Sequence, residues 1–200
     1  MGNSGITALL FSGGIDSTAI AWWKRPDKLL TIDYGQRTAV AEIESSKCLA
    51  GFIGIPHELL HVDLKEIGLG SLYGGDPSRL SDHPEWWPFR NQMLITVAAA
   101  WSVANDVDKL LIGTVKSDSC FGDGTKKFVD AMKSLLQLQE GSIQLEAPAL
   151  DLDSFDLVKV SGMPREHLLL CFSCSVALDA CGTCRSCLKY RSVLHSSGLL

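Results

Sequence analysis

Short apolar runs alternate with longer segments of helical pattern along the chain. Four runs have the length of strands, and four longer segments have the pattern of helices. The expected strands cover residues 8–11, 29–32, 58–62 and 109–113, and the expected helices cover residues 16–24, 38–51, 91–104 and 126–140. Strands that alternate with crossovers of this length predict an α/β fold, in which a parallel sheet carries helices on both faces.

Glycine-containing segments follow three of the four expected strands, at residues 12–14, 33–35 and 113–114. In open parallel sheets, ligands bind beyond the carboxyl ends of the strands. We therefore expect these three segments to converge on one crevice.

A long loop is expected at residues 68–88, which contain four glycines and three prolines. This composition excludes a long regular element. Loops of this length in compact domains are usually functional or disordered. Trp86 and Trp87 favour a lid or an interface, because a pair of large aromatic side chains is unfavourable in water. Capping of the sheet edge is the alternative.

The last part of the chain is expected to form a small element of the same domain. Asp153 and Ser154 predict the N-cap and the start of a helix at residues 155–160, which a glycine and a proline then end. From residue 165 onward the chain is rich in cysteine and too short for a second domain. We therefore expect a main domain at residues 1–165 and a C-terminal cysteine element at residues 166–200.

The composition fits one well-buried globular domain, with 46% hydrophobic and 20% charged residues among 200 and a mean hydropathy of +0.15. The net charge of −5 and the pI of about 5.5 argue against broad binding of a nucleic-acid backbone. No run of 18 apolar residues and no signal-peptide pattern is visible, so we expect no membrane span and a cytoplasmic location. In that compartment, clustered cysteines bind metal or do chemistry more often than they form disulfides.

The most informative segment is Ser-Gly-Gly-Ile-Asp-Ser-Thr at residues 12–18, directly after the first apolar run. A strand, a glycine-rich turn and a helix together present free backbone N–H groups and the positive end of a helix dipole to an anion. Glycine lets the backbone approach phosphate oxygens closely. The lysine of the P-loop motif is absent. A glycine-rich turn that binds no ligand is the alternative.

Four cysteines near the C-terminus have the spacing C-x6-C-x2-C-x2-C, namely Cys174, Cys181, Cys184 and Cys187. Thiolates at this spacing suit a tetrahedral zinc ion, and four of them leave no open position, which indicates a structural site. Cys171 competes as a fifth candidate, although it ends an apolar run as a buried small hydrophobe would. The typical continuation of an iron–sulfur motif is missing. Free or catalytic thiols are the remaining alternative.

Two further cysteines stand alone. Cys48 lies in a helical pattern and is expected in the core. Cys120 lies in a loop near the expected crevice, which makes it the one solitary cysteine to test.

Four segments, in this order, resemble the 7-cyano-7-deazaguanine synthase (QueC-like) family of PP-loop ATP pyrophosphatases. They are the S-G-G-x-D-S loop at 12–17, Asp-Tyr-Gly-Gln-Arg at 33–37, Phe-Arg-Asn at 89–91 and Cys-Gly-x-Cys-x2-Cys at 181–187. The resemblance runs from Leu9 to about Leu188. It implies a Rossmann-like fold of the HUP (PP-loop) type with a small C-terminal zinc-binding module, and it implies a homodimer.

The resemblance also implies an activity. The family activates 7-carboxy-7-deazaguanine with ATP and adds ammonia to give an amide, which a second ATP dehydrates to a nitrile. This chain would then be an ATP-dependent ligase that uses Mg²⁺, contains zinc and takes a small 7-deazaguanine substrate. The Phe-Ser-Cys segment at 172–174 is similar to the family's first zinc-ligand region, which favours Cys174 over Cys171.

The resemblance further implies roles for individual residues. The residues implied for ATP and magnesium are Phe11, Ser12, Gly13, Gly14, Asp16, Ser17, Thr18, Asp33, Tyr34 and Gly113. Those implied for the deazaguanine substrate are Arg90, Asn91, Lys116, Asp118 and Asp123. Those implied for catalysis are Asp16, Ser17, Arg90 and Asp118.

The segment after residue 114 departs from the family, which commonly carries an acidic loop there. Lys116, Lys126 and Lys127 make this loop more basic, and the approach to Arg90 through two tryptophans is also unusual. These features resemble a divergent subgroup in bacterial anti-phage defence systems. Its members are thought to attach a deazaguanine to the amino end of a partner protein instead of using ammonia.

Two other functions stay open. An RNA thiolase would need a reactive cysteine, which Cys120 could supply, and a basic surface for RNA, against which the net charge argues. A non-catalytic regulator, whose zinc element docks a partner, would bind ATP without releasing pyrophosphate.

Overall fold

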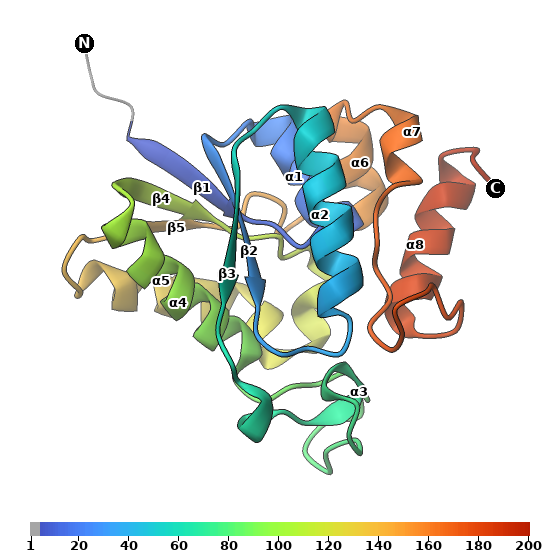
Figure 1. The fold of residues 1–200 in the computed structure, drawn as a ribbon, viewed down its shortest axis with the longest axis horizontal. Helices are drawn as coiled ribbons and strands as arrows, with labels where there is room; N and C mark the ends of the chain where they lie inside the picture. The colour runs from blue at the N-terminus through green and yellow to red at the C-terminus, as the bar shows by residue number, and fades with distance from the viewer. Residues whose placement is uncertain (1–4) are drawn as a thin grey trace.

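The computed structural model describes residues 5–200, and its centre is a sheet of five parallel strands. The strand order is β3-β2-β1-β4-β5, with helices on both faces (Figure 1). The predicted α/β architecture is therefore confirmed, and among the strands the sequence pattern missed the short edge strand β5. The strands are β1 (Ile6–Leu10), β2 (Lys28–Asp33), β3 (His57–His61), β4 (Val107–Leu111) and β5 (Gln144–Glu146).

Side chains alternate between two buried layers, because successive residues of a strand point to opposite faces of the sheet. Leu9 is in register with Leu29 on one side and Leu111 on the other, and all three belong to one apolar core. Their neighbours Ala8 and Leu30 belong to a second core on the opposite face. Two-sided burial explains why these strands read as continuous apolar runs.

The helices divide between these two cores. One face of the sheet packs against α1 (Ile15–Lys24), α2 (Ala39–Ile53), α6 (Ser154–Ser161), α7 (Arg165–Leu168) and α8 (Arg185–Ser196). The other face packs against α4 (Arg90–Ala104) and α5 (Lys126–Gln137). Within residues 5–200, no helix combines the length and the apolar character that a membrane span requires.

The C-terminal cysteine element packs on the main sheet. Leu168, Cys171, Val193 and Leu194 are buried in the same core as α1 and α2. Figure 1 shows α8 beside α7, next to the helices that follow β1 and β2. Cys48 is exposed on α2, so its expected place in the core is wrong.

The segment 68–88 is anchored to the rest of the domain. It contains the short helix α3 (Gly70–Tyr73), and its Trp87 side chain is only 1% exposed. The ring of Trp87 packs edge-on against Tyr34, with 5.1 Å between centroids. The backbone N–H of Arg37 also donates to the carbonyl of Leu72 at 2.7 Å. The segment is thus tied to the chain that follows β2.

Candidate functional site

A cavity of about 340 Å³ lies beyond the carboxyl ends of β1, β2 and β4. Ser12, Tyr34 and Gly113, one from each glycine-containing segment, line it. Parallel strands end at the same edge of the sheet, so their loops meet there. The volume lies in the usual range for small-molecule sites.

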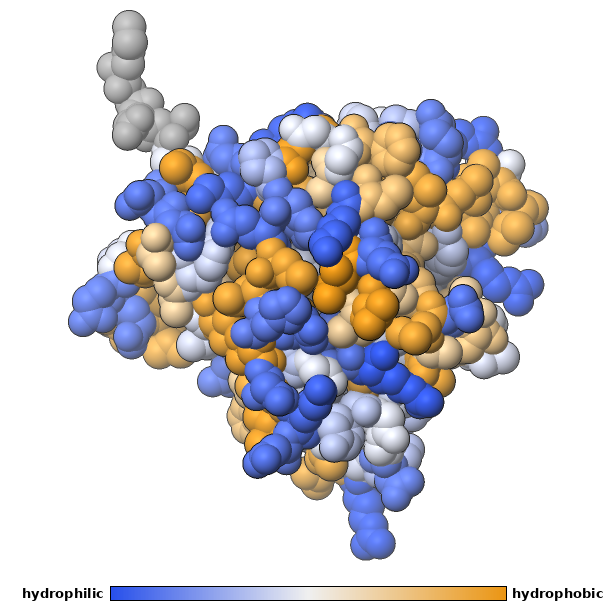
Figure 2. Space-filling model, viewed as in Figure 1, coloured by the Kyte–Doolittle hydropathy of each residue, from blue (hydrophilic) through white to orange (hydrophobic). Residues whose placement is uncertain are grey.

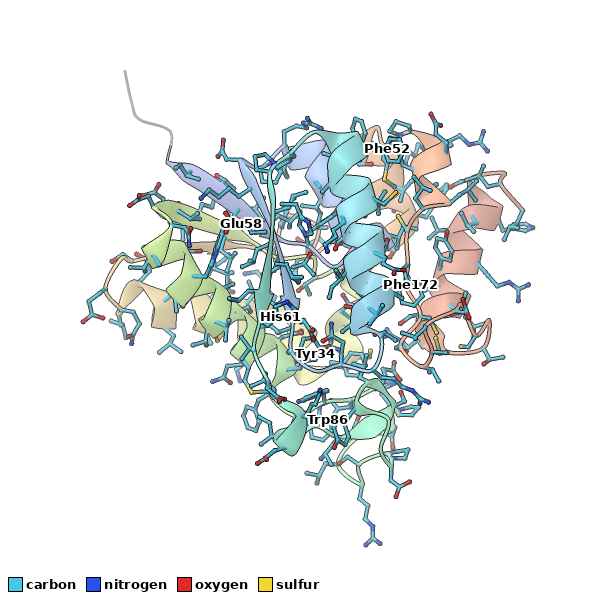
Figure 3. The ribbon with its side chains drawn as sticks, viewed as in Figure 1. Tyr34, Phe52, Glu58, His61, Trp86 and Phe172 are labelled. Atoms are coloured by element: carbon cyan, nitrogen blue, oxygen red, sulfur yellow. The ribbon has the colours of Figure 1, made fainter. Side chains whose placement is uncertain are left out.

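The turn between β1 and α1 is held by hydrogen bonds to α2 and to the segment between α7 and α8. The carbonyl of Gly13 accepts from the backbone N–H of Phe172 at 3.1 Å, and the Ser45 hydroxyl lies 3.0 Å from the same oxygen. That hydroxyl also lies 2.9 Å from the carbonyl of Leu170. Figure 3 shows Phe172 on the segment between α7 and α8, beside α2. The turn is therefore fixed by segments far away in the sequence.

Helix α1 starts directly after this turn. Gly14 is its N-cap, and the Gly14 carbonyl accepts from both the backbone N–H and the hydroxyl of Thr18, at 3.0 and 2.8 Å. The first N–H groups of a helix have no partner within it. Because Ser12, Gly14 and Ser17 line the cavity, this helix start presents an anion-binding end to it.

Asp16 and Lys189 form an ion pair at this helix start. The ammonium group of Lys189 donates to Asp16 Oδ2 at 2.7 Å and lies 4.0 Å from Asp118 Oδ1. Within residues 5–200, the other oxygen of Asp16, Oδ1, is buried without a hydrogen-bond partner. Burial alone would lower the pKa of Lys189, but the two carboxylates outweigh it and raise that pKa. Lys189 is therefore charged.

Arg90 stands at the first position of α4, on the cavity wall. Burial would lower its pKa, but the nearby carboxylates of Asp123, Glu42 and Asp118 raise it, so the guanidinium keeps its charge. Burial raises the pKa of Tyr34 well above its usual range, so the phenol is neutral and can donate a hydrogen bond.

Asn91 and Asp123 join the start of α4 to the loop after β4. The backbone N–H of Asn91 donates to Asp123 Oδ2 at 3.3 Å, and its side-chain amide donates to the Asp123 carbonyl at 3.2 Å. Asp118 is fixed in the same loop, because its Oδ2 accepts from the backbone N–H of Val115 at 3.0 Å. Burial raises the pKa of Asp118, and the neighbouring Lys189 opposes this shift.

Most of the residues expected in the site line this cavity. They are Phe11, Ser12, Gly14, Asp16, Ser17, Tyr34, Arg90, Asn91, Gly113, Asp118 and Asp123. Gly13, Thr18, Asp33 and Lys116 are not among the lining residues. Asp33 instead accepts from the backbone N–H of Gly35 at 3.0 Å and pairs with His61 at 3.1 Å. Figure 3 shows Tyr34 and His61 at neighbouring strand ends.

Four charged residues of the cavity wall were missed by the sequence analysis: Glu42, Glu85, Arg185 and Lys189. Glu42, Arg185 and Lys189 lie outside the glycine-containing segments, and Glu85 lies in the long 68–88 loop. Glu85 is 9% exposed, and its Oε1 lies 3.9 Å from the Arg185 guanidinium. Burial raises the pKa of Glu42, which faces Arg90. The single signal that could have found Lys189 and Arg185 is their position next to the cysteine motif.

Cys174, Cys181, Cys184 and Cys187 form one cluster, in which the four sulfur atoms lie within 4.8 Å of one another. Cys181 Sγ and Cys187 Sγ are 3.8 Å apart, which equals the edge of about 3.8 Å expected of a tetrahedron with Zn–S bonds of about 2.3 Å. The backbone N–H of Cys184 donates to Cys181 Sγ at 3.3 Å and helps to lower the pKa of that thiol to about 6. The donor set therefore suits a metal ion and is consistent with zinc.

Cys171 lies outside this cluster. Its thiol is buried in the core and donates to the carbonyl of His167 at 3.4 Å. Burial raises its pKa to about 12, so the thiol is neutral. The geometry favours Cys174 as the fourth member of the cluster.

Comparison with known proteins gives one family. The model of the family described as "Queuosine biosynthesis protein QueC" matches residues 7–197. The 7-cyano-7-deazaguanine synthase 1 of Desulfitobacterium hafniense (strain Y51) is 31% identical, over 83% of this chain and 86% of its own. The 7-cyano-7-deazaguanine synthases of Methanothermobacter thermautotrophicus and Desulforudis audaxviator are each 30% identical, over 95% of this chain and over 94% and 96% of their own.

Proposed function

The chain belongs to the QueC family, and from this membership we propose that it activates the carboxylate of 7-carboxy-7-deazaguanine with ATP and couples it to an amine. A carboxylate is a poor acyl donor, because oxide would have to leave. In the proposed first step, a carboxylate oxygen attacks the α-phosphorus of ATP, the bond to the bridging oxygen breaks and pyrophosphate leaves. The amine then attacks the carbonyl carbon, AMP leaves and the nitrogen loses a proton.

One observation supports this proposal most: Ser12, Gly14 and Ser17, at the start of α1, line the same 340 Å³ cavity as the charged Arg90. The helix start favours the phosphates, and Arg90 favours a second anion, the carboxylate. Holding two anions in line is the main task of such an enzyme, and fixed charges perform it without a protein nucleophile.

Magnesium would be held at the buried, free Oδ1 of Asp16, because carboxylate oxygens are the ligands that Mg²⁺ prefers. When bound, the ion supplies neutralisation of phosphate charge. Zinc would be held by the four-cysteine cluster, where four sulfur ligands leave no position for a substrate. Its role is then structural, and it fixes the start of α8.

The reaction is tested with purified protein, ATP, 7-carboxy-7-deazaguanine and ¹⁵N-ammonia, followed by mass spectrometry. We expect AMP, pyrophosphate and a labelled amide or nitrile, and no pyrophosphate with 7-deazaguanine, which lacks the carboxyl group. ATP binding without any pyrophosphate release would contradict the proposal and favour a regulator. Product that forms only with a partner protein, on its N-terminal amine, would assign the chain to the defence-type reaction. Full conversion to nitrile with ammonia would remove that alternative.

Replacing Cys120 by serine tests the thiolase alternative. The Cys120 side chain is exposed and is not among the cavity-lining residues. We therefore expect pyrophosphate release within about twofold of the unchanged protein, as for an ordinary surface substitution. A loss of more than about tenfold, with the unfolding temperature unchanged, would favour sulfur transfer through this thiol.

We also propose that two copies of the chain associate. Phe52 and Leu169 are 58% and 56% exposed, and the Phe52 ring packs against His167 on α7. Figure 2 shows apolar side chains at the surface where α2 and α7 lie. Light scattering coupled to size-exclusion chromatography distinguishes a dimer from a monomer, and a monomer at micromolar concentration would contradict the proposal.

A further inference from the structure

Among the described residues that line the cavity, Lys189 is the cationic side chain that contacts the start of α1, through Asp16. We propose that it binds the β- and γ-phosphates of ATP, and so supplies from the C-terminal helix the cation that the S-G-G-x-D-S turn lacks. The inference rests on the proposed use of ATP and adds a phosphate-binding residue to it.

The placement of the ammonium group is the first argument. Asp16 is the second residue of α1, at the helix end that favours anions. The Lys189 ammonium lies 2.7 Å from Asp16 Oδ2, although 173 positions separate the two residues. Both side chains line the cavity. The ammonium group therefore already lies where the helix start would receive phosphate oxygens.

The other two cations of the cavity wall have partners elsewhere. The Arg185 guanidinium donates to the carbonyl of Ser117 at 2.7 Å and faces Glu85. Arg90 is surrounded by Tyr34, Asp123 and Glu42. Among the described residues that line the cavity, Lys189 is thus the cation in contact with the 12–18 turn.

The surplus of carboxylates around Lys189 is the second argument. Two carboxylates, Asp16 and Asp118, flank one ammonium group, and the Lys189 side chain keeps 25% of its surface exposed. Because this side chain lines the cavity and is still partly exposed, a phosphate oxygen can reach the ammonium group and replace Asp16 Oδ2 as its partner.

The cysteine cluster determines where Lys189 lies. Cys184 is the N-cap of α8, where its sulfur accepts from the backbone N–H of Cys187 at 3.4 Å. Lys189 is the fifth residue of α8 and follows Cys187 by two positions. The position of the ammonium group then depends on the same four sulfur atoms that suit a metal ion.

The inference is tested by binding measurements on Lys189→Met, Lys189→Arg and the control Arg191→Met, which changes an exposed cation on the same helix. Calorimetry with magnesium compares α,β-methylene-ATP, which cannot release pyrophosphate, with AMP. We expect Lys189→Met to bind the triphosphate about 10- to 100-fold more weakly, the usual cost of losing a hydrogen bond to a charged group. AMP affinity should stay within about twofold, Lys189→Arg should recover part of the loss, and Arg191→Met should bind both as the unchanged protein does.

Three outcomes overturn the inference. They are equal triphosphate binding by Lys189→Met and the unchanged protein, equal losses for the triphosphate and AMP, and a loss in Arg191→Met that matches the loss in Lys189→Met. Metal content and unfolding temperature identify a variant that misfolds. If Lys189→Met misfolds, the triphosphate and AMP affinities of Lys189→Arg are compared with those of the unchanged protein instead. If the unchanged protein binds the triphosphate but releases no pyrophosphate with the deazaguanine acid, the proposed function fails and the binding comparison still decides the role of Lys189.

Discussion

The Gly13→Ala substitution is expected to destabilise the protein by about 2–5 kcal/mol and to lower pyrophosphate release by more than about 100-fold. Gly13 has φ +72°, where an L-residue costs about 1–2 kcal/mol. A Cβ there would also lie 2.6 Å from the backbone nitrogen of Ser46 and 2.8 Å from the Ser45 hydroxyl. Overpacking of this kind costs about 1–3 kcal/mol. The turn would have to move away from α2, and the helix start would move with it.

Gly54→Ala is the matched control. Gly54 also has φ +72°, but a Cβ there would meet no atom within 4 Å among the described residues. Gly54→Ala should lower the free energy of unfolding only by the cost of a positive φ, about 1–2 kcal/mol, and should leave pyrophosphate release within about twofold of the unchanged protein. Denaturant unfolding and a pyrophosphate assay measure both variants. Equal stability losses in the two variants would show that the contact with α2 does not constrain the turn.

The Cys174→Ser substitution is expected to remove the metal ion and most of the pyrophosphate release. Apparent binding free energies of structural zinc reach about 10–16 kcal/mol in small peptides, and such sites lose this stabilisation when a ligand is missing. Because α8 starts in the cluster and carries Arg185 and Lys189 into the cavity, the loss should reach the cavity wall as well. We expect zinc by elemental analysis to fall from about one ion per chain to below about 0.1, together with a lower unfolding temperature.

Cys171→Ala separates the cluster from the core. Cys171 is buried but lies outside the cluster, so alanine should cost about 1–2 kcal/mol of packing and keep one metal ion per chain. Full metal content in Cys174→Ser, or loss of the ion in Cys171→Ala, would reverse this assignment. Elemental analysis of the unchanged protein after treatment with a chelator gives the reference value for complete removal of the metal ion.

Strands β1 and β2 were predictable because both faces of the sheet are covered there. Leu9 and Leu29 belong to one core and Ala8 and Leu30 to the other, so the runs are apolar without alternation. The glycine-rich turn was predictable for a different reason, since its residue types specify close approach to an anion. The resemblance to the QueC-like family is confirmed by the matched family model.

Strand β5, helix α8 and some residues of the cavity wall could not be predicted from the pattern of apolar and polar residues. Strand β5 has three residues, of which only Leu145 is buried, so no apolar run marks it. Helix α8 buries Cys187, Val193 and Leu194 on one side, and the cysteine spacing obscured its helical pattern. Lys189 and Glu42 reach the cavity through tertiary packing, which residue spacing along one chain does not encode.

The Ser45 hydroxyl, which lies between the carbonyls of Gly13 and Leu170, has a consequence for biosynthesis. These contacts span 32 and 125 positions, and such non-local closures form slowly because a long loop must first be brought together. A nascent chain that has left the ribosome only as far as α6 already contains β1 to β5. It still lacks Leu170 and Phe172, which contact Ser45 and Gly13 in the folded protein. The turn between β1 and α1 therefore acquires its full set of contacts only after the C-terminal segment emerges.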